Sequence, residues 1–275
     1  MRDRALQRNP DSNPTMTRLA SIILAAGKGT RMNSDLPKVA HPVAGRPMVL
    51  WVADACAEAG CERIVVVVGH QQEVVRQIFA DWPGDAPPVE FAVQKPQFGT
   101  GHAVQCAAPA LADFAGDVVV LAGDGPAIRT QTLDRLVGTH RTSKAAATLA
   151  TARIPDPTGY GRIARDAAGR FAAIVEHKNC TPDQLKINEV NPSYYCFDAK
   201  RLFDALGRIT RDERSGEYFL TDVPALLLAE GERVEIVDAV PPEDVLSINT
   251  PAQLAEVDAI LRKRAAMPAG KGGAS

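Results

Sequence analysis

Two glycines and two basic residues near the start of the chain have the types and the spacing of a phosphate-binding loop. Gly27 and Gly29 lie in the stretch from Leu24 to Met32, which reads LAAGKGTRM. Glycines leave backbone amides uncovered by side chains, and such amides form a concavity that binds anions. Because Arg31 and Lys38 add two positive charges, the stretch predicts a site for the phosphates of a nucleoside triphosphate.

Neither of the two best known glycine-rich loops fits this stretch. A P-loop needs Gly, four residues and then Gly-Lys-Ser/Thr, whereas Lys28 is followed here by Gly29 and the earlier glycine is missing. The dinucleotide-binding pattern G-x-G-x-x-G would place its third glycine at Met32. On the glycines alone, an ordinary strand-to-helix turn is an equal alternative.

Two oxygen-bearing side chains could hold a metal ion. Asp124 lies between Gly123 and Gly125, directly after an apolar run. Mg²⁺ commonly binds one or two protein carboxylates together with phosphate oxygens and water. Asn249 precedes the last helical segment, and its carbonyl oxygen could complete such a site. The alternatives are a turn aspartate, since Asp favours turns, and an asparagine that only flanks a helix start.

Other polar side chains suit a base and a sugar. Gln94 ends a predicted strand, and its amide can donate to and accept from a base edge at once. The glycines at 99 and 101 would let a flat ring lie against the backbone. Glu176 and Asn191 lie at or beside strands, and their carboxylate and amide suit sugar hydroxyl and acetamido groups. A charged surface edge is the alternative for the segment around Glu176.

Alternating strands and helices position these residues in the first half of the chain. β-Branched runs such as Arg63–Val68 are typical of parallel strands that are covered on both faces. The alternation predicts a right-handed, doubly wound parallel sheet, with ligand loops at the carboxyl ends of its strands. We expect strands at 19–24, 63–68, 90–93 and 117–122, and helices at 47–59, 71–79, 101–111 and 130–140.

The pattern changes after Lys144, where hairpin turns indicate a mixed or antiparallel half laid beside the first. We expect strands at 145–153, 171–175, 189–197 and 234–238, with a further strand after the turn at 158–163. We expect helices at 199–206, 221–229 and 251–266. The chain would then be a single α/β domain over 18–266, with a nucleotide-binding part at 18–144, a sugar-binding part at 145–250 and a closing helix at 251–266.

Composition bounds the class of protein. The 275 residues suffice for a full core, and the net charge of -2 offers no general attraction to nucleic acid. The sequence has no apolar run of about 20 residues, which a membrane helix needs. Residues 1–17 resemble a disordered leader and 267–275 a flexible tail. The five scattered cysteines lack any C-x-x-C pair and predict reduced thiols in a cytoplasmic protein.

As an ordered set, these motifs closely resemble the uridylyltransferase half of the bifunctional N-acetylglucosamine-1-phosphate uridyltransferases (GlmU), within the sugar nucleotidyltransferase family. The resemblance runs from about Leu19 to Arg264. It implies a Rossmann-like, doubly wound, mainly parallel mixed sheet of the GT-A-like nucleotidyltransferase type. The motifs are Leu24–Met32, Leu36–Lys38, Gly69–Gln71, Gln97–Ala103, Gly123–Asp124, Gly159–Ile163, Val175–Lys178, Glu189–Asn191, Gly216–Asp222 and Ile248–Thr250.

The resemblance implies an enzyme that makes UDP-N-acetylglucosamine and pyrophosphate from UTP and N-acetylglucosamine 1-phosphate, with Mg²⁺ as cofactor and no nucleic-acid or membrane partner. Glucose 1-phosphate as the substrate and a non-catalytic sugar-nucleotide-binding relative are the alternatives. The implied site residues are catalytic Arg31 and Lys38; nucleotide-binding Leu24, Ala26, Gly27, Lys28, Gly29, Gln94, Gly99 and Thr100; sugar-binding Gly161, Glu176 and Asn191; and the metal ligands Asp124 and Asn249.

The sequence departs from the family pattern around the metal and the sugar. The family has an aliphatic residue after the aspartate and a tyrosine two positions before it, where this chain has Gly125 and Ala122. The family follows its asparagine with Thr-Gly, where this chain has Pro192-Ser193. UTP use therefore follows more directly from the resemblance than the choice of sugar does. No hexapeptide repeat is present, so we expect no left-handed β-helix acetyltransferase domain.

Overall fold

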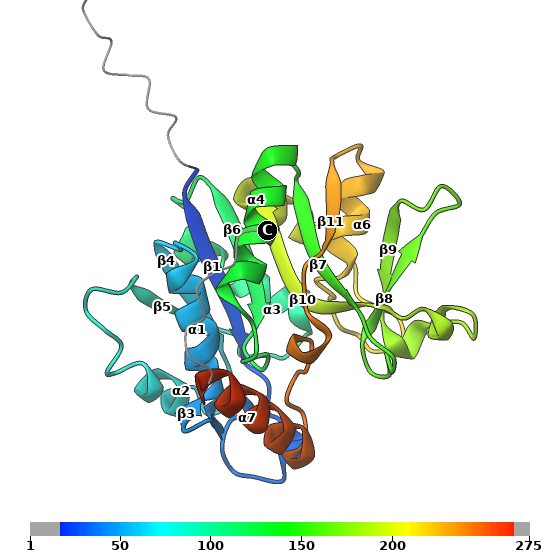
Figure 1. The fold of residues 1–275 in the computed structure, drawn as a ribbon. Helices are drawn as coiled ribbons and strands as arrows, with labels where there is room; N and C mark the ends of the chain where they lie inside the picture. Colours follow the sequence, from blue (N-terminus) through cyan, green and yellow to red (C-terminus); the bar gives the residue numbers. More distant parts are fainter. Residues whose placement is uncertain (1–16, 267–275) are drawn as a thin grey trace, which may run out of the picture.

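A single mixed sheet of nine strands crosses the structure, a computed structural model that describes residues 17–266 (Figure 1). The main path through the sheet runs β11-β7-β10-β6-β1-β4-β5, and β8 pairs with both β10 and β9. The strands are β1 (Leu19–Ala25), β4 (Arg63–Val68), β5 (Val89–Val93), β6 (Asp117–Ala122), β7 (Ala147–Arg153), β8 (Gly161–Arg165), β9 (Phe171–Val175), β10 (Glu189–Asp198) and β11 (Val234–Asp238).

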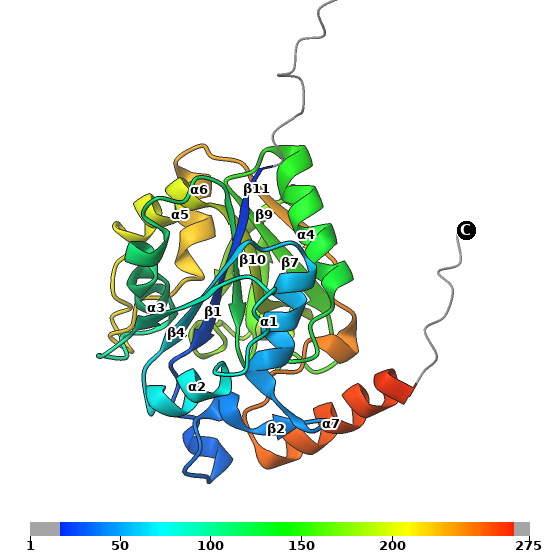
Figure 2. The ribbon, with the colours of Figure 1, turned by 90° about the vertical axis from the view of Figure 1, so that its left-hand side faces the viewer.

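Helices cover both faces of this sheet. α1 and α4 pack on one face, and α3, α5 and α6 pack on the other (Figure 2). α7 lies at the lower edge of the sheet, beside a small hairpin of β2 (Pro42–Val43) and β3 (Arg46–Pro47). The helices are α1 (Met48–Glu58), α2 (Gln72–Ile78), α3 (Thr100–Cys106), α4 (Thr130–Ser143), α5 (Ala199–Leu206), α6 (Asp222–Ala229) and α7 (Pro251–Ala266).

The central strands are apolar on both sides because each side packs against a helical layer. Ile22 and Ile23 are adjacent and both fully buried, yet they belong to the two separate halves of the core. Successive side chains of a strand point to opposite faces, so a strand that is covered twice needs an uninterrupted apolar run. This requirement explains why the predicted strand at 63–68 matches β4 residue for residue.

The strand order reverses beside β1. The chain runs from β1 to β4 and β5 on one side, and then returns to β6 on the other side. All four strands are parallel, so their carboxyl ends share one edge. In open α/β sheets, ligands bind in the crevice at such a reversal. The fold therefore places the loops after β1 and β6 at the expected position for a ligand.

The predicted fold class is confirmed, and the differences are local. The half after Lys144 continues the same sheet, because β10 pairs antiparallel with β6. The helix predicted at 101–111 ends at Cys106 and resumes as a 3-10 turn, Ala108–Leu111, around Pro109, a residue that cannot donate a helical hydrogen bond. The β2–β3 hairpin was not predicted. The predicted tail at 267–275 and all of the predicted leader except Thr17 lie outside the described residues.

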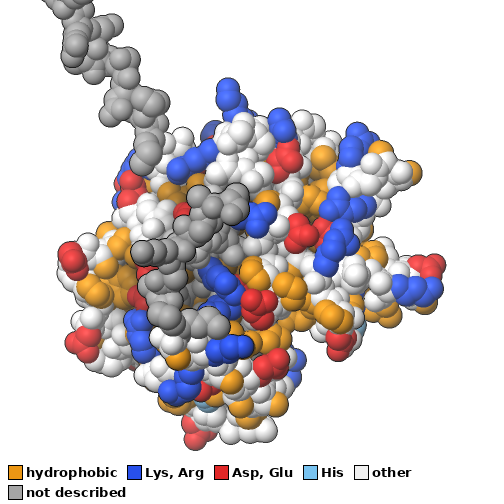
Figure 3. Space-filling model, in the orientation of Figure 1, with side chains coloured by type: hydrophobic (Ala, Val, Ile, Leu, Met, Phe, Trp, Pro, Cys, Tyr) orange, Lys and Arg blue, Asp and Glu red, His pale blue; other side chains and the backbone are white. Residues whose placement is uncertain are grey.

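The surface and the cysteines agree with a globular protein of balanced charge. Acidic and basic side chains are interspersed on the face shown in Figure 3. No helix within residues 17–266 is long and apolar enough to cross a membrane. All five cysteines are free thiols, as predicted.

Candidate active site

The glycine-rich loop after β1 faces the loop that carries Asp124 after β6. The two loops are joined where they leave the sheet, because the amide of Gly123 donates to the carbonyl oxygen of Leu24 at 2.9 Å. Leu24 thus holds the two loops together through its backbone. The crevice at the strand reversal begins at this point.

Close approach to Lys38 explains the glycine at position 29. Gly29 has a φ of +66°, and a β-carbon built on it would lie 2.6 Å from the Cβ of Lys38. An L-residue would meet both backbone strain and a clash there. Gly29 precedes the 3-10 turn Thr30–Met32, and Lys38 begins another, Lys38–Ala40. The fold thereby brings the two predicted cations to the mouth of the crevice.

Four predicted residues from distant parts of the chain meet in one polar cluster. The ammonium group of Lys38 donates to the carboxylate of Asp124 and, at 2.6 Å, to Oδ1 of Asn249. Nη2 of Arg31 donates to the same Asn249 oxygen at 2.7 Å. Nδ2 of Asn249 donates to the carbonyl of Ser247 at 3.2 Å, which turns Oδ1 towards the cations. The structure therefore joins the predicted catalytic and metal-binding residues directly.

The donor set of this cluster fits a small hard cation. Oδ1 of Asp124 is buried and has no hydrogen-bond partner within the described residues. An unpaired buried carboxylate oxygen is unfavourable, so it calls for a positive partner. One carboxylate and one amide oxygen are the kind of protein ligands that Mg²⁺ uses when phosphates and water supply the rest. Within the described residues, no group of three or more His, Cys, Asp or Glu side chains could hold a metal instead.

A polar cavity of about 460 Å³ opens beside the cluster. Predicted residues from all four classes line it: Arg31, Thr100, Asp124, Gly161, Glu176, Asn191 and Asn249. Two residues that were not among the predicted site residues line it as well: Gln253, and Tyr160 of the quoted Gly159–Ile163 motif. Burial raises the pKa of the Tyr160 phenol, which donates to the carbonyl of Val245 at 3.3 Å.

Protein contacts hold the two side chains that were predicted to bind the sugar. Thr221 donates its hydroxyl to Oε1 of Glu176 at 2.8 Å, which leaves the other oxygen of that carboxylate for a ligand. The Oδ1 atom of Asn191 accepts the amide of Ser193 at 3.1 Å, and its Nδ2 donates to the hydroxyl of Tyr195 at 2.6 Å. Asn191 can therefore offer a ligand its second amide hydrogen and the remaining lone pair of Oδ1. Sequence reasoning missed Thr221, although it lies in the quoted Gly216–Asp222 motif.

An irregularity of β10 shapes the same wall. The pairing of β10 with β7 shifts register between Val190 and Tyr194, and Ser193 has a φ of +66°. Bulges of this kind often re-aim side chains next to active sites. Tyr194 points at Gly125, where an added β-carbon would lie 2.8 Å from the tyrosine hydroxyl. The hydroxyl of Tyr194, which belongs to β10, therefore occupies the space that a side chain at position 125 would need.

A second polar cavity, of about 410 Å³, lies on the other side of the glycine-rich loop. Its lining includes Lys28 and Gln94, together with Gly69, His70 and Gln97. The Nε2 atom of Gln94 donates to the carbonyl of Gly99 at 3.0 Å and to Nδ1 of His102 at 3.1 Å. Oε1 of Gln94 remains to receive a donor from a ligand. Gln97 donates to the carbonyl of Ala26 at 2.5 Å and so ties this cavity to the glycine-rich loop.

The glycines at 99 and 101 serve packing, which differs from the expectation that they leave room for a ring. Gly99 has a φ of +93°, and a β-carbon there would lie 2.5 Å from the carbonyl oxygen of Tyr218. The amide of Tyr218 donates to Phe98 at 2.7 Å, and its carbonyl accepts from Gly101 at 2.8 Å. The segment around Tyr218 therefore occupies the space above these glycines and fixes the position of their loop.

Comparisons with known proteins agree on one family. A family model described as MobA-like NTP transferase domain matches residues 21–223. The Bifunctional protein GlmU of Pelobacter propionicus is 46% identical over 249 residues, which are 90% of this chain and 53% of that protein. The one of Geobacter metallireducens is 48% identical over 246 residues, 90% of this chain and 51% of that protein. The chain thus spans about half the length of these relatives.

A solved structure shows the same fold. A UDP-glucose pyrophosphorylase complexed with UDP-glucose superposes with a TM-score of 0.69 and 16% identity, over 90% of this chain and 100% of that chain. At this identity the likeness concerns the fold alone. It agrees with the predicted nucleotidyltransferase type of sheet.

Proposed function

Because the chain belongs to the family of MobA-like NTP transferase domains, we propose that it is a sugar-1-phosphate uridylyltransferase. The proposed reaction joins UTP and N-acetylglucosamine 1-phosphate to give UDP-N-acetylglucosamine and pyrophosphate. The identity with GlmU proteins across 90% of the chain supports this choice of substrates.

The cluster of Lys38, Arg31, Asp124 and Asn249 is the observation that carries the proposal. It combines two cations and two oxygen ligands at the strand reversal, between the glycine-rich loop and a sugar-sized cavity. A site for a sugar alone would not need this concentration of charge. A triphosphate with its metal would.

In the proposed reaction, a phosphate oxygen of the sugar 1-phosphate attacks the α-phosphorus of UTP. A bond forms between them, and the bond from the α-phosphorus to the bridging oxygen breaks, so that pyrophosphate leaves. The attacking oxygen is already ionised at neutral pH, and no general base is required. The protein therefore contributes positioning and charge neutralisation.

Each part of the site has a role in this proposal. Arg31 and Lys38 stabilise negative charge that grows on the departing pyrophosphate. Asp124 and Asn249 hold Mg²⁺, which when bound neutralises charge on the phosphates. The backbone of Leu24, Ala26, Gly27, Lys28 and Gly29 borders the triphosphate, and Glu176, Asn191 and Gly161 border the sugar.

We assign the base to the cavity that contains Gln94, next to Gly99 and Thr100. Because Nε2 of Gln94 is engaged by Gly99 and His102, its carbonyl oxygen is the group left for a ligand. Uracil presents an N–H donor at N3 in its usual tautomer, whereas cytosine presents an acceptor there. Gln94 therefore favours UTP over CTP.

A second candidate is the same transfer to glucose 1-phosphate. It is the alternative substrate that the sequence motifs leave open. The small side chain of Ala122 and the segment Pro192-Ser193 also alter the wall of the sugar cavity. The sugar 1-phosphate is thus the part of the proposal that most needs a direct test.

A substrate screen tests both candidates. The purified chain is incubated with Mg²⁺, one nucleoside triphosphate and one sugar 1-phosphate, while pyrophosphate release and the mass of the product are followed. We expect the highest kcat/KM for UTP with N-acetylglucosamine 1-phosphate. A preference for glucose 1-phosphate would select the second candidate, and equal use of UTP, CTP and ATP would refute the base assignment. Tight binding of the sugar nucleotide without turnover would identify a binding protein.

A further inference from the structure

We propose that Arg264 of α7 is a positioning residue that fixes the distance between Asp124 and Asn249. On this proposal, which rests on the proposed function, the last helix forms part of the metal-binding half of the site. Arg264 touches neither residue, and it acts through the two loops that carry them.

Arg264 reaches one loop directly. Its Nη1 atom donates to the carbonyl oxygen of Ala127 at 2.7 Å. Ala127 lies three residues after Asp124, in the same turn. The amide of Ile128 donates to the carbonyl oxygen of Gly125 at 3.3 Å and closes that turn. A shift of Ala127 would therefore also move the segment that carries Asp124.

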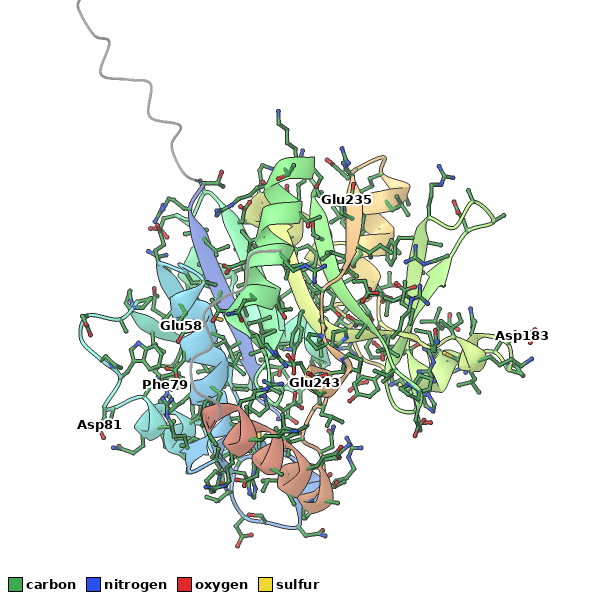
Figure 4. All side chains as sticks on the ribbon, in the orientation of Figure 1. Glu58, Phe79, Asp81, Asp183, Glu235 and Glu243 are labelled. Atoms are coloured by element: carbon green, nitrogen blue, oxygen red, sulfur yellow. The ribbon has the colours of Figure 1, made fainter. Side chains whose placement is uncertain are left out.

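Arg264 reaches the other loop through Asp244. Its Nη2 atom forms an ion pair with the carboxylate of Asp244, which is fully buried. Asp244 belongs to the 3-10 turn Pro242–Asp244, shortly before Asn249. The neighbouring Glu243 marks this turn in Figure 4, between the sheet and α7.

Further contacts make the Asp244 turn a junction between the two loops. Arg129 donates Nη2 to Asp244 at 3.1 Å, and the hydroxyl of Tyr194 donates to the Asp244 carbonyl at 3.3 Å. The amide of Ile248 donates to the backbone carbonyl of Asp124 at 2.9 Å. Ile248 is adjacent to Asn249, so this bond links the backbone segments that carry the two proposed metal ligands. Arg264 supports this link because it contacts both loops, one at Ala127 and the other at Asp244.

The chemistry of the side chain explains why an arginine is needed. A guanidinium offers several N–H donors in a rigid fork and can serve two acceptors in fixed directions. Lysine offers a single ammonium on a flexible stem, so it can hold one loop but not the angle between two. Arg129 would still pair with Asp244 if Arg264 were lost, so the buried carboxylate would not be left alone. The fold should therefore survive the substitution.

Mn²⁺ binding tests the proposal without any turnover. The variants are Arg264→Met, Arg264→Lys and the matched control Arg262→Met, which changes an arginine of the same helix whose side chain is 63% exposed and pairs with Asp258 within α7. Mn²⁺ affinity is measured on each folded chain by electron paramagnetic resonance, without nucleotide. The Mg²⁺ concentration for half-maximal rate and the KM for the sugar 1-phosphate are measured beside it.

We expect Arg264→Met to weaken Mn²⁺ binding by about tenfold, as loss of partners that orient metal ligands commonly does. Arg264→Lys should lie between that variant and the wild type, Arg262→Met should match the wild type, and the KM for the sugar phosphate should change least. Wild-type Mn²⁺ affinity in Arg264→Met would overturn the proposal, as would the absence of Mn²⁺ binding by the wild type. Failure of the proposed function would appear differently, as intact Mn²⁺ binding without formation of a UDP-sugar.

Discussion

The ammonium group of Lys38 lies against the carboxylate of Asp124, with side chains that are only 14% and 19% exposed. A protein cation thus lies between the Asp124 carboxylate and the Asn249 amide oxygen, the two groups that we assign to a metal ion. When Mg²⁺ and UTP bind, Lys38 has to exchange the carboxylate for phosphate oxygens. The same side chain can then balance Asp124 before binding and the pyrophosphate during transfer.

Replacing Lys38 should separate these two tasks. In Lys38→Met we expect kcat to fall by at least about 100-fold, since the loss of one preorganised charge contact typically costs about 3 kcal/mol. Mn²⁺ binding without nucleotide should become tighter, because Asp124 loses its competing cation. Steady-state kinetics and Mn²⁺ titration check both parts, and Arg31→Met should reproduce the loss of kcat.

Lys200→Met, at a side chain that is 83% exposed, controls for the loss of a positive charge. Turnover near the wild-type value in both Lys38→Met and Arg31→Met would contradict the assignment.

Asp124→Asn should act mainly through the metal. The substitution removes the carboxylate charge that we propose binds the metal ion, and it keeps a side-chain oxygen at the same position. We expect the Mg²⁺ concentration for half-maximal rate to rise by about tenfold or more, and residual activity to increase with Mg²⁺. Magnesium titrations of the wild type and the variant check this. If both proteins saturate at the same concentration, Asp124 is not a ligand.

Two glycines of the same loop should respond differently to alanine. Gly29→Ala meets the Cβ of Lys38 and a positive φ, whereas a β-carbon on Gly27 would have no heavy atom within 4 Å. We expect Gly29→Ala to lower the free energy of unfolding by about 1–3 kcal/mol, the usual cost of a strained backbone, and Gly27→Ala to leave it nearly unchanged. Urea unfolding of the two variants decides the matter. Equal stability would mean that Lys38 can move away from the added carbon at little cost.

Low pH should destabilise the folded protein where β8 pairs with β10. Burial alone would raise the pKa of Glu189, but the paired hydrogen bonds from Arg165 and the charge of Arg153 lower it below its usual value. A lowered pKa in the folded state stabilises the fold above the unfolded pKa of about 4.3 and loses that effect as the pH falls. We expect Glu189→Gln to be less stable than the wild type by about 2 kcal/mol at pH 7, with a smaller difference near pH 3.5.

The control for this prediction is Asp183→Asn, at an exposed carboxylate on the tip of the molecule (Figure 4). Urea unfolding at several pH values is the measurement. A difference between the wild type and Glu189→Gln that stays constant from pH 7 to pH 3.5 would show that the ion pairs do not stabilise the fold. Asp183→Asn should track the wild type at every pH.

Sequence patterns predicted the elements that obey one strong rule. β4 and β6 match their predicted ranges because a strand buried on both faces requires an unbroken apolar run. The β2–β3 hairpin has strands of two residues, too short for any alternation. Its only signal was Ala44-Gly45, whose φ values of +47° and +85° fit a type I′ turn although alanine rarely takes the first position.

The site was predictable where chemistry points to residue type, and less so where packing decides. Lys38 could be named because it adds a positive charge beside a glycine-rich loop, whereas the pairing of Asp124 with Asn249 came from the resemblance to the family. The contacts of Thr221 with Glu176 and of Arg264 with Ala127 join positions far apart in the chain, so no local pattern reveals them. The glycines at 99 and 101 were recognised as special, but their partner, Tyr218, is visible only in the folded chain.

The contact between Tyr194 and Gly125 means that the residue type at one position limits the residue type at the other. The tyrosine hydroxyl lies where the first carbon of any side chain at 125 would lie, and it is itself held by the carbonyl of Asp244. A side chain at 125 would have to displace the Tyr194 hydroxyl and with it the hydrogen bond to Asp244. Positions 125 and 194 are therefore coupled, because a larger residue at 125 requires Tyr194 to move or a smaller residue to replace it.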